Sequence, residues 1–260
     1  MDNALIPAAT VLLLRDKPAF EVLMVERHAD IVFAGGALVF PGGRIDAGDH
    51  SAEWVVHCDG LDDIPSEQHA PRIAALREAF EETGILIARR DGAAISGDDA
   101  NRLAPWRMRI ENDDSLFLQM IREEGLTLEV RTLHLFARWR PPQAVAHRRY
   151  DTWFFAVQAP DNQTARADGG EATEVVWTAP AAALAARDKG VRKMIFPTSR
   201  NVELLNLSGS ANEAFAFAAK RPIRPVEPHI VERGAGRFLT IPEDLGYPVT
   251  EEPLEQTMRS

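Results

Sequence analysis

Residues 77–85 read Arg77-Glu78-Ala79-Phe80-Glu81-Glu82-Thr83-Gly84-Ile85 and place three carboxylates close together, at positions 78, 81 and 82. On a helix, residues three and four positions apart lie on one face, so these side chains are neighbours. Unpaired carboxylates at this spacing repel one another, and all-oxygen ligands favour a hard cation such as Mg²⁺ or Mn²⁺. A solvated acidic helix face is the usual explanation of such a charge run. The preceding sequence favours the cation.

That preceding segment reads Phe40-Pro41-Gly42-Gly43-Arg44-Ile45-Asp46-Ala47-Gly48-Asp49. The two segments together resemble the halves of a Nudix box. This motif is a Gly, five residues, a Glu, seven residues and then Arg-Glu-U-x-Glu-Glu-x-Gly-U, where U is a bulky apolar residue. Counting from Gly43, the first acidic position falls on Asp49, so an Asp replaces the expected Glu.

The two halves stand unusually far apart. Arg77 follows Asp49 by 28 positions instead of the eight that the motif requires, so an insert at about 51–70 interrupts the box. His69 stands eight positions before Arg77 and cannot replace a carboxylate. An interrupted box is similar to that of the insert-bearing Nudix proteins related to the peroxisomal acyl-coenzyme A diphosphatase. The resemblance runs from about residue 5 to 208, through the segments 23–28, 33–40, 149–155, 174–180 and 196–198.

The resemblance implies an α+β fold, a Nudix-type α/β/α sandwich with a mixed sheet, an insert within the box and a C-terminal appendage. We expect a hydrolase domain at 1–208 and an extension at 209–260 that packs on this domain or on a partner subunit. The pattern of apolar residues and turn signals agrees with this class. It predicts strands at 8–14, 20–25, 37–40, 126–130, 133–139, 152–157 and 173–177. It predicts helices at 71–84, 99–110, 115–124, 180–186, 199–207 and 211–220 and a hairpin at 230–240, and it marks 89–101 as a polar stretch rich in Gly, Asp and Ala.

Composition restricts the class of protein further. The chain has 260 residues and a formal net charge of −10, which argues against general nucleic-acid binding. A single cysteine, Cys58, excludes an internal disulfide framework and suits a reducing compartment. No run approaches the ~18 apolar residues of a membrane helix, and the acidic start lacks the charge of a signal peptide. We therefore expect a cytoplasmic protein with a small-molecule nucleotide substrate and no nucleic-acid or membrane partner, and we leave open a homodimer.

The metal ligands are predicted within the box. Glu78 and Glu82, one helical turn apart, are the best candidates for binding Mg²⁺ or Mn²⁺. Glu81 is either a third ligand or an acceptor that holds metal-bound water, and Gly42 can lend its backbone carbonyl. Asp49 assists at longer range, and Arg77 orients a carboxylate rather than touching the substrate.

The general base and the substrate contacts are predicted outside this cluster. Glu171, in a flexible segment before a strand, is a candidate base; the alternative is Glu174, which can instead brace that strand. Arg27 and Arg44 flank the glycine loop and are predicted to bind phosphate. Positive charge also gathers at Arg138, Arg140, His147, Arg148 and Arg149. These residues either bind a nucleotide phosphate or pair with acidic neighbours on the surface.

Two classes of function follow. The first is Mg²⁺-dependent hydrolysis of a diphosphate linkage, for which the resemblance points to coenzyme A or acyl-CoA. The products would be adenosine 3′,5′-bisphosphate and (acyl-)4′-phosphopantetheine. ADP-ribose, NADH and dinucleoside polyphosphates are alternative substrates. The second class is a non-catalytic Nudix-fold ligand sensor, which the intact carboxylates disfavour. The insert, with Trp54 and Leu61, is predicted to shape the substrate pocket.

Overall fold

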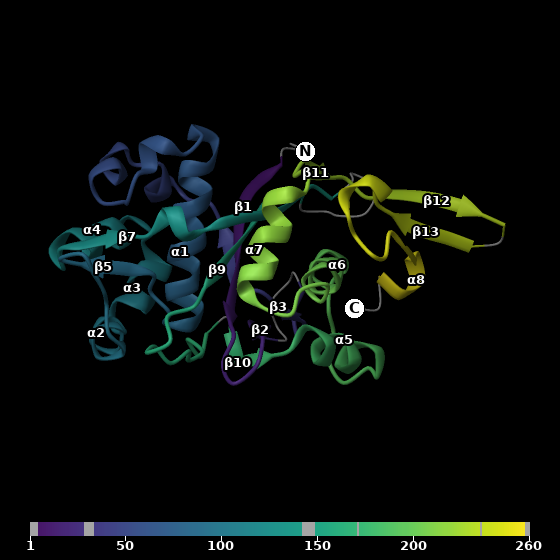
Figure 1. Ribbon diagram of the computed structural model, residues 1–260, viewed down its shortest axis with the longest axis horizontal. Coiled ribbons are helices and arrows are strands. Elements are labelled where there is room, and N and C mark those ends of the chain that lie inside the picture. The colour runs from purple at the N-terminus through teal and green to yellow at the C-terminus, as the bar shows by residue number, and fades with distance from the viewer. Residues whose placement is uncertain (1–4, 29–33, 142–148, 171, 235, 258–260) are drawn as a thin grey trace.

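The structure is a computed structural model that describes residues 5–28, 34–141, 149–170, 172–234 and 236–257. In this part of the chain a mixed sheet of eight strands forms the centre of the molecule (Figure 1). Its main path runs β10-β2-β1-β9-β8-β11, with β3 added to β2 and β4 added to β1. The bounds are β1 (Ile6–Arg15), β2 (Glu21–Arg27), β3 (Leu38–Val39), β4 (Gly42–Arg44), β8 (His134–Trp139), β9 (Tyr150–Gln158), β10 (Ala172–Thr178) and β11 (Pro225–Val226).

The sheet is mixed because β1 runs parallel to β9 but antiparallel to β2 and β4. Successive residues of a strand point to opposite faces, so each central strand supplies side chains to two core clusters, one on each face of the sheet. Leu13 and Leu23 lie in the cluster on the α1 side, whereas Leu12 and Met24 lie in the cluster on the other side. The mixed sheet and the α+β class predicted from the sequence are confirmed.

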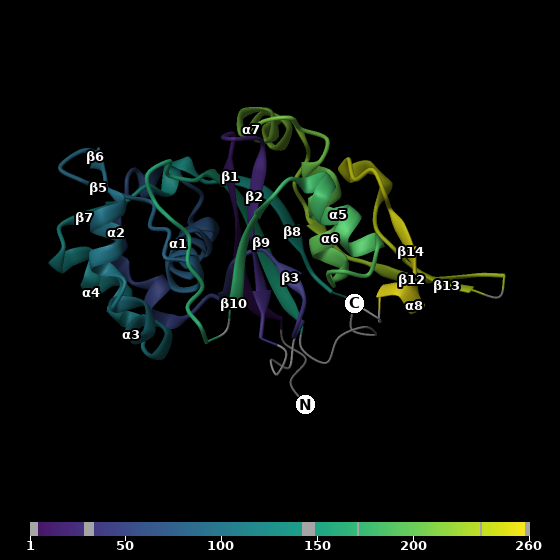
Figure 2. The ribbon, with the colours of Figure 1, turned by 90° about the horizontal axis from the view of Figure 1, so that it is seen from below.

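Helices cover both faces of the sheet, as Figure 2 shows. Helix α1 (His69–Thr83) lies on one face, and α5 (Pro180–Asp188), α6 (Phe196–Leu205) and α7 (Ala211–Lys220) lie on the other. Helix α1 ends at Gly84, whose φ of 75° is a left-handed conformation that glycine adopts without strain. Its apolar side chains Ile73, Leu76 and Phe80 are buried against the sheet, which leaves the carboxylates on another side.

A second group of elements packs outside α1. It consists of β5 (Ala88–Arg90), β6 (Ala93–Ala94), α2 (Gly97–Leu103), α3 (Trp106–Asn112), α4 (Ser115–Glu123) and β7 (Leu126–Leu128). The polar stretch at 89–101 contains the β5–β6 hairpin and the start of α2. The predicted helix at 99–110 is two helices, with Pro105 between them, since proline lacks the N–H that a continuous helix needs.

The insert in the box folds into short 3₁₀ turns at Ala52–Val56, Leu61–Asp63 and Ser66–Gln68, after a turn at Ala47–His50 in the first half of the box. Its anchor is Trp54, which is 1% exposed, donates from Nε1 to the Gly48 carbonyl at 2.9 Å and packs on Phe117 of α4 with ring centroids 5.6 Å apart. The insert surrounds the first turn of α1 and lines a cavity of about 300 Å³ there. The carboxylates lie in the second half of α1, so the effect of the insert on the substrate pocket stays a prediction.

The C-terminal extension continues the second core cluster. Leu239, Leu245 and Leu254 are buried in the same cluster as α6. Tyr247 joins the two parts, because its hydroxyl accepts from Trp139 Nε1 at 3.0 Å and donates to Asn201 Oδ1 at 3.1 Å. The remaining elements are β12 (His229–Arg233), β13 (Gly236–Thr240), β14 (Glu251–Pro253) and α8 (Leu254–Thr257).

The β12–β13 hairpin projects from the body in Figure 1. The extension shares its core with the preceding residues, but the division of the chain at 208 and a homodimer stay predictions. In the described part of the chain, no helix combines the length and the apolar character needed to cross a membrane.

Candidate active site

The fold brings the two halves of the interrupted box together, since α1 faces the loop and strand at 42–44. The Gly42 N–H donates to Glu82 Oε2 at 3.1 Å. A Cβ atom placed on Gly43 would stand 2.5 Å from Glu78 Oε1, so only glycine allows the backbone to come this close. The two predicted metal ligands therefore face the glycine backbone, although the insert separates the halves in sequence.

Arg77 is the centre of a buried network of carboxylates. Its Nε and Nη2 donate to the two Asp49 oxygens at 3.0 and 2.9 Å, a bidentate pair. Its Nη1 donates to Glu78 Oε1 at 2.9 Å and to Glu81 Oε1 at 2.8 Å. Arg77 therefore holds three carboxylates at once, which agrees with its predicted orienting role. Asp49, which is only 2% exposed, offsets the charge of Arg77 on the side of the first half of the box.

The carboxylates carry more negative charge than the nearby arginines neutralise. Burial raises the pKa of Glu78 well above its usual value despite Arg77, and Glu81 and Glu82 raise it further. Burial likewise raises the pKa of Glu81 to about 7, and it raises the pKa of Asp49. Desolvation and like charge both disfavour the ionised forms, so the site lacks positive charge.

A divalent cation would supply that charge, and the residues present fit one. Glu78 and Glu82 offer hard oxygen ligands beside the glycine loop, and Glu81 stands next to them on the same helix. Within the described residues, no three Asp, Glu, His or Cys side chains already surround one point as metal ligands. Arg77 binds Asp49 and Glu81 instead. The N–H of Gly42 faces Glu82, and metal binding by its carbonyl stays a prediction.

Of the predicted phosphate-binding arginines, Arg27 belongs to the site. It ends β2, and its Nη1 lies 3.7 Å from Glu82 Oε1. Arg44 is exposed and follows Gly43 in β4. Neighbouring residues of a strand point to opposite faces, so Arg44 points away from the face on which Gly43 meets Glu78.

Arg138 lies on the α1 face but is already compensated. It forms a bidentate pair with Asp151 at 2.8 and 2.7 Å, and its guanidinium stands 4.0 Å from the ring centroid of Trp153. Arg140 donates to the same Asp151. These contacts favour the alternative that this basic region pairs with acidic neighbours. Arg149 donates from Nε to the Pro141 carbonyl at 3.1 Å, just before β9. His147 and Arg148 lie outside the described residues.

The first candidate for the general base, Glu171, also lies outside the described residues. The segment before it is tied to the site, because the Arg166 N–H donates to the Thr83 carbonyl at the end of α1 at 2.8 Å. The alternative, Glu174, accepts from Arg192 Nη2 at 2.7 Å, and Arg192 also binds Glu26 of the adjoining strand. These ion pairs favour the alternative that Glu174 braces the edge strand of the sheet.

Two residues of α3, Arg107 and Glu111, lie at the site although the sequence analysis did not predict them. Arg107 donates from Nε to the Glu81 carbonyl and from Nη2 to the Arg166 carbonyl, both at 2.9 Å, and so ties α1 to the segment before Glu171. Glu111 helps to raise the pKa of Glu81, after burial and Asp49. Both follow the box by more than twenty positions in a helix with no recognisable motif, so only the tertiary packing reveals them.

Comparison with known families agrees with this geometry. A family model described as the NUDT19 Nudix domain matches residues 57–197, and a general NUDIX domain model matches residues 4–96. A protein from Xenopus laevis named acyl-coenzyme A diphosphatase NUDT19 is 28% identical, over 90% of this chain and 72% of its own. The Homo sapiens protein of that name is 27% identical, over 94% of this chain and 77% of its own.

A solved structure of a NUDIX hydrolase has a similar fold. The crystal structure of a NUDIX hydrolase from Alicyclobacillus acidocaldarius superposes with a TM-score of 0.69 and 25% sequence identity. The match covers 83% of this chain and 97% of that one. Over half of this chain matches the NUDT19 model, and its box residues surround one buried site. The chain belongs to the Nudix hydrolases, in the NUDT19 Nudix domain family.

Proposed function

We propose that this protein is a diphosphatase that uses a divalent metal, Mg²⁺ or Mn²⁺, to hydrolyse the diphosphate linkage of coenzyme A or acyl-CoA. The products are adenosine 3′,5′-bisphosphate and (acyl-)4′-phosphopantetheine. One observation carries the chemistry. Glu78, Glu81 and Glu82 form a buried cluster of carboxylates against the glycine backbone of residues 42 and 43, and this cluster lacks enough positive charge to balance it. The names of the relatives support coenzyme A as the substrate.

Glu78 and Glu82 would hold the metal, and Glu81 would accept a hydrogen bond from its water. A bound divalent ion neutralises charge that develops on phosphoryl oxygens and makes water a better nucleophile. Every other part is supplied by the protein. Arg77 fixes the rotamers of Glu78 and Glu81, so the cluster does not need to reorganise during the reaction.

The remaining groups bind and position the substrate. Arg27, beside Glu82, is placed to bind a phosphoryl oxygen with its guanidinium. Gly43 lets Glu78 lie against the backbone, and Gly42 lets β4 lie against β1, since a Cβ atom on either residue would clash there.

A substrate panel tests this proposal. The purified protein is incubated with Mg²⁺ and CoA, acetyl-CoA, ADP-ribose, NADH or a diadenosine polyphosphate, and the products are separated by chromatography. We expect adenosine 3′,5′-bisphosphate from CoA with the wild type and none with EDTA. Preferred cleavage of ADP-ribose, NADH or the polyphosphate would keep the diphosphatase chemistry and replace the substrate. Metal binding without turnover of any compound would contradict the proposal and favour a ligand sensor.

A further inference from the structure

The segment between α5 and α6 reaches the active-site end of the sheet. Lys193 forms a parallel bridge with Ala37, and the Leu38 N–H donates to the Lys193 carbonyl at 2.8 Å. On its other side Ala37 is opposite Arg27, whose N–H donates to the Ala37 carbonyl at 3.1 Å. Arg27, Ala37 and Lys193 therefore occupy one row across three adjacent stretches of chain.

The packing of its neighbours shows which face Lys193 occupies. Met194 is buried in the cluster of Leu38 and Met24, on the side of α5 and α6. Ile195 packs on Val25, Ala37 and Val39, on the opposite side. Because side chains alternate along an extended segment, Lys193 lies on the same face as Ile195. This is also the face of Arg27, whose guanidinium lies near Glu82.

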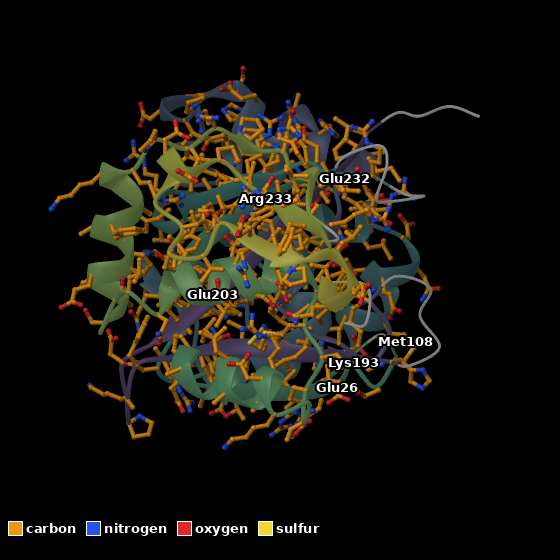
Figure 3. All side chains as sticks on the ribbon, turned by 90° about the vertical axis from the view of Figure 1, so that its right-hand side faces the viewer. Glu26, Met108, Lys193, Glu203, Glu232 and Arg233 are labelled. Carbon is orange, nitrogen blue, oxygen red and sulfur yellow. The ribbon has the colours of Figure 1, made fainter. Side chains whose placement is uncertain are left out.

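The charge of Lys193 is available to a ligand, whereas that of its neighbour is not. Arg192 binds both Glu26 and Glu174, so two carboxylates offset its charge. Lys193 is exposed, and its ammonium forms no ion pair or hydrogen bond with the described part of the chain. Figure 3 labels Lys193 and Glu26 toward the same edge of the molecule.

The spacing of the row distinguishes the roles of its two cations. Two inter-strand steps separate the backbones of Arg27 and Lys193 by ~10 Å, and only the methyl group of Ala37 stands between them. A diphosphate held at Glu82 and Arg27 leaves Lys193 facing a more distant part of the nucleotide. Coenzyme A carries a third phosphate there, on the ribose 3′-oxygen, one sugar ring away from the diphosphate.

We propose that Lys193 binds the 3′-phosphate of coenzyme A and so determines the specificity of the site for CoA over nucleotides without that group. The inference rests on the proposed function, because it takes the diphosphate to lie between Glu82 and Arg27. The ammonium needs no metal and no proton transfer for this role. It attracts the phosphate dianion as a point charge, which an arginine at the same position also does.

The test compares Lys193→Ala and Lys193→Arg with wild type on CoA and on dephospho-CoA, which lacks only the 3′-phosphate. Lys189→Ala is the matched control, because Lys189 is an exposed lysine of the same connection outside the row. We expect Lys193→Ala to lower kcat/KM for CoA roughly 10- to 100-fold more than kcat/KM for dephospho-CoA. Lys193→Arg restores the preference for CoA, and Lys189→Ala keeps it. Equal losses on both substrates would overturn the assignment.

A binding measurement separates this inference from the proposed function. Calorimetry with adenosine 3′,5′-bisphosphate and with 5′-AMP needs no turnover. We expect wild type to bind the bisphosphate more tightly and Lys193→Ala to lose that difference, even if CoA proves not to be the substrate. An unchanged ratio of the two affinities in Lys193→Ala would show that Lys193 does not recognise the 3′-phosphate.

Discussion

Arg77 shows how one residue sets the properties of the site. It is 2% exposed and contacts Asp49, Glu78 and Glu81 together. Burial alone would lower the pKa of Arg77, but these carboxylates raise it, so the guanidinium stays charged. The same contacts limit how far burial raises the pKa of each carboxylate. The network keeps an excess of negative charge for a cation beside Gly43.

Replacing Glu82 by Gln separates metal binding from folding. Glu82 contacts the Gly42 N–H, which an amide oxygen also accepts, so the fold is kept. The loss of one carboxylate ligand should lower kcat by roughly 100-fold or more, the scale of losing one electrostatic catalytic group. Steady-state kinetics with Mg²⁺ and thermal melting in EDTA measure both effects.

The matched control is Glu67→Gln, which removes an exposed carboxylate of the insert. It should retain wild-type kcat. Full activity of Glu82→Gln, or an equal loss in the control, would exclude Glu82 as a metal ligand.

Replacing Arg77 by Ala should be the most destabilising change in the site. It leaves Asp49, Glu78 and Glu81 buried without their counter-ion, and breaking such buried pairs costs ~3–5 kcal/mol. Urea denaturation of the metal-free protein measures the change in unfolding free energy. A change below ~1 kcal/mol would mean that these pairs are solvent-screened, as surface pairs are.

At the scale of elements, sequence reasoning succeeds where the information is local. Helix α1 and the faces of its residues follow from Pro71, Gly84 and the spacing of apolar side chains. Sequence reasoning left pairing of Arg138 with acidic neighbours as one of two alternatives, and Asp151 could not be named as the partner because that depends on the register of β8 against β9. The reach of Arg107 to α1 likewise depends on how α3 packs, which no local pattern specifies.

The insert is the element whose role is least determined by the motif, and Trp54 tests it. Trp54 is buried against Phe117, so Trp54→Ala should cost ~3–5 kcal/mol of stability. Because Trp54 anchors the insert, which is predicted to shape the substrate pocket, KM for CoA should also rise at temperatures where the variant is folded. Chemical denaturation and kinetics on the same sample measure both. An unchanged KM in the folded variant would contradict that role of the insert.

At the scale of the whole molecule, the site couples metal binding to stability. The pKa of Glu81 is about 7 in the folded protein and 4.5 as its ordinary value. The folded state therefore binds more protons than the unfolded state between these values, and stability falls as pH rises from 4.5 to 7. Burial raises the pKa of Glu78 and Asp49 in the same direction.

We therefore expect the melting temperature in EDTA to fall by several degrees between pH 5 and 7.5. Mg²⁺ binds the ionised carboxylates, so it should raise the melting temperature more at pH 7.5 than at pH 5. Differential scanning fluorimetry across this range measures both slopes. A metal-induced shift that is equal at the two pH values would mean that the metal binds elsewhere.

Hydrolysis of coenzyme A by the purified protein, followed by chromatography, tests the diphosphatase activity most directly. We expect adenosine 3′,5′-bisphosphate and 4′-phosphopantetheine in equal amounts, formed by wild type with Mg²⁺ and absent with EDTA or with Glu82→Gln. Intact coenzyme A after prolonged incubation of the folded, metal-loaded protein would contradict it, as would products formed equally well by Glu82→Gln.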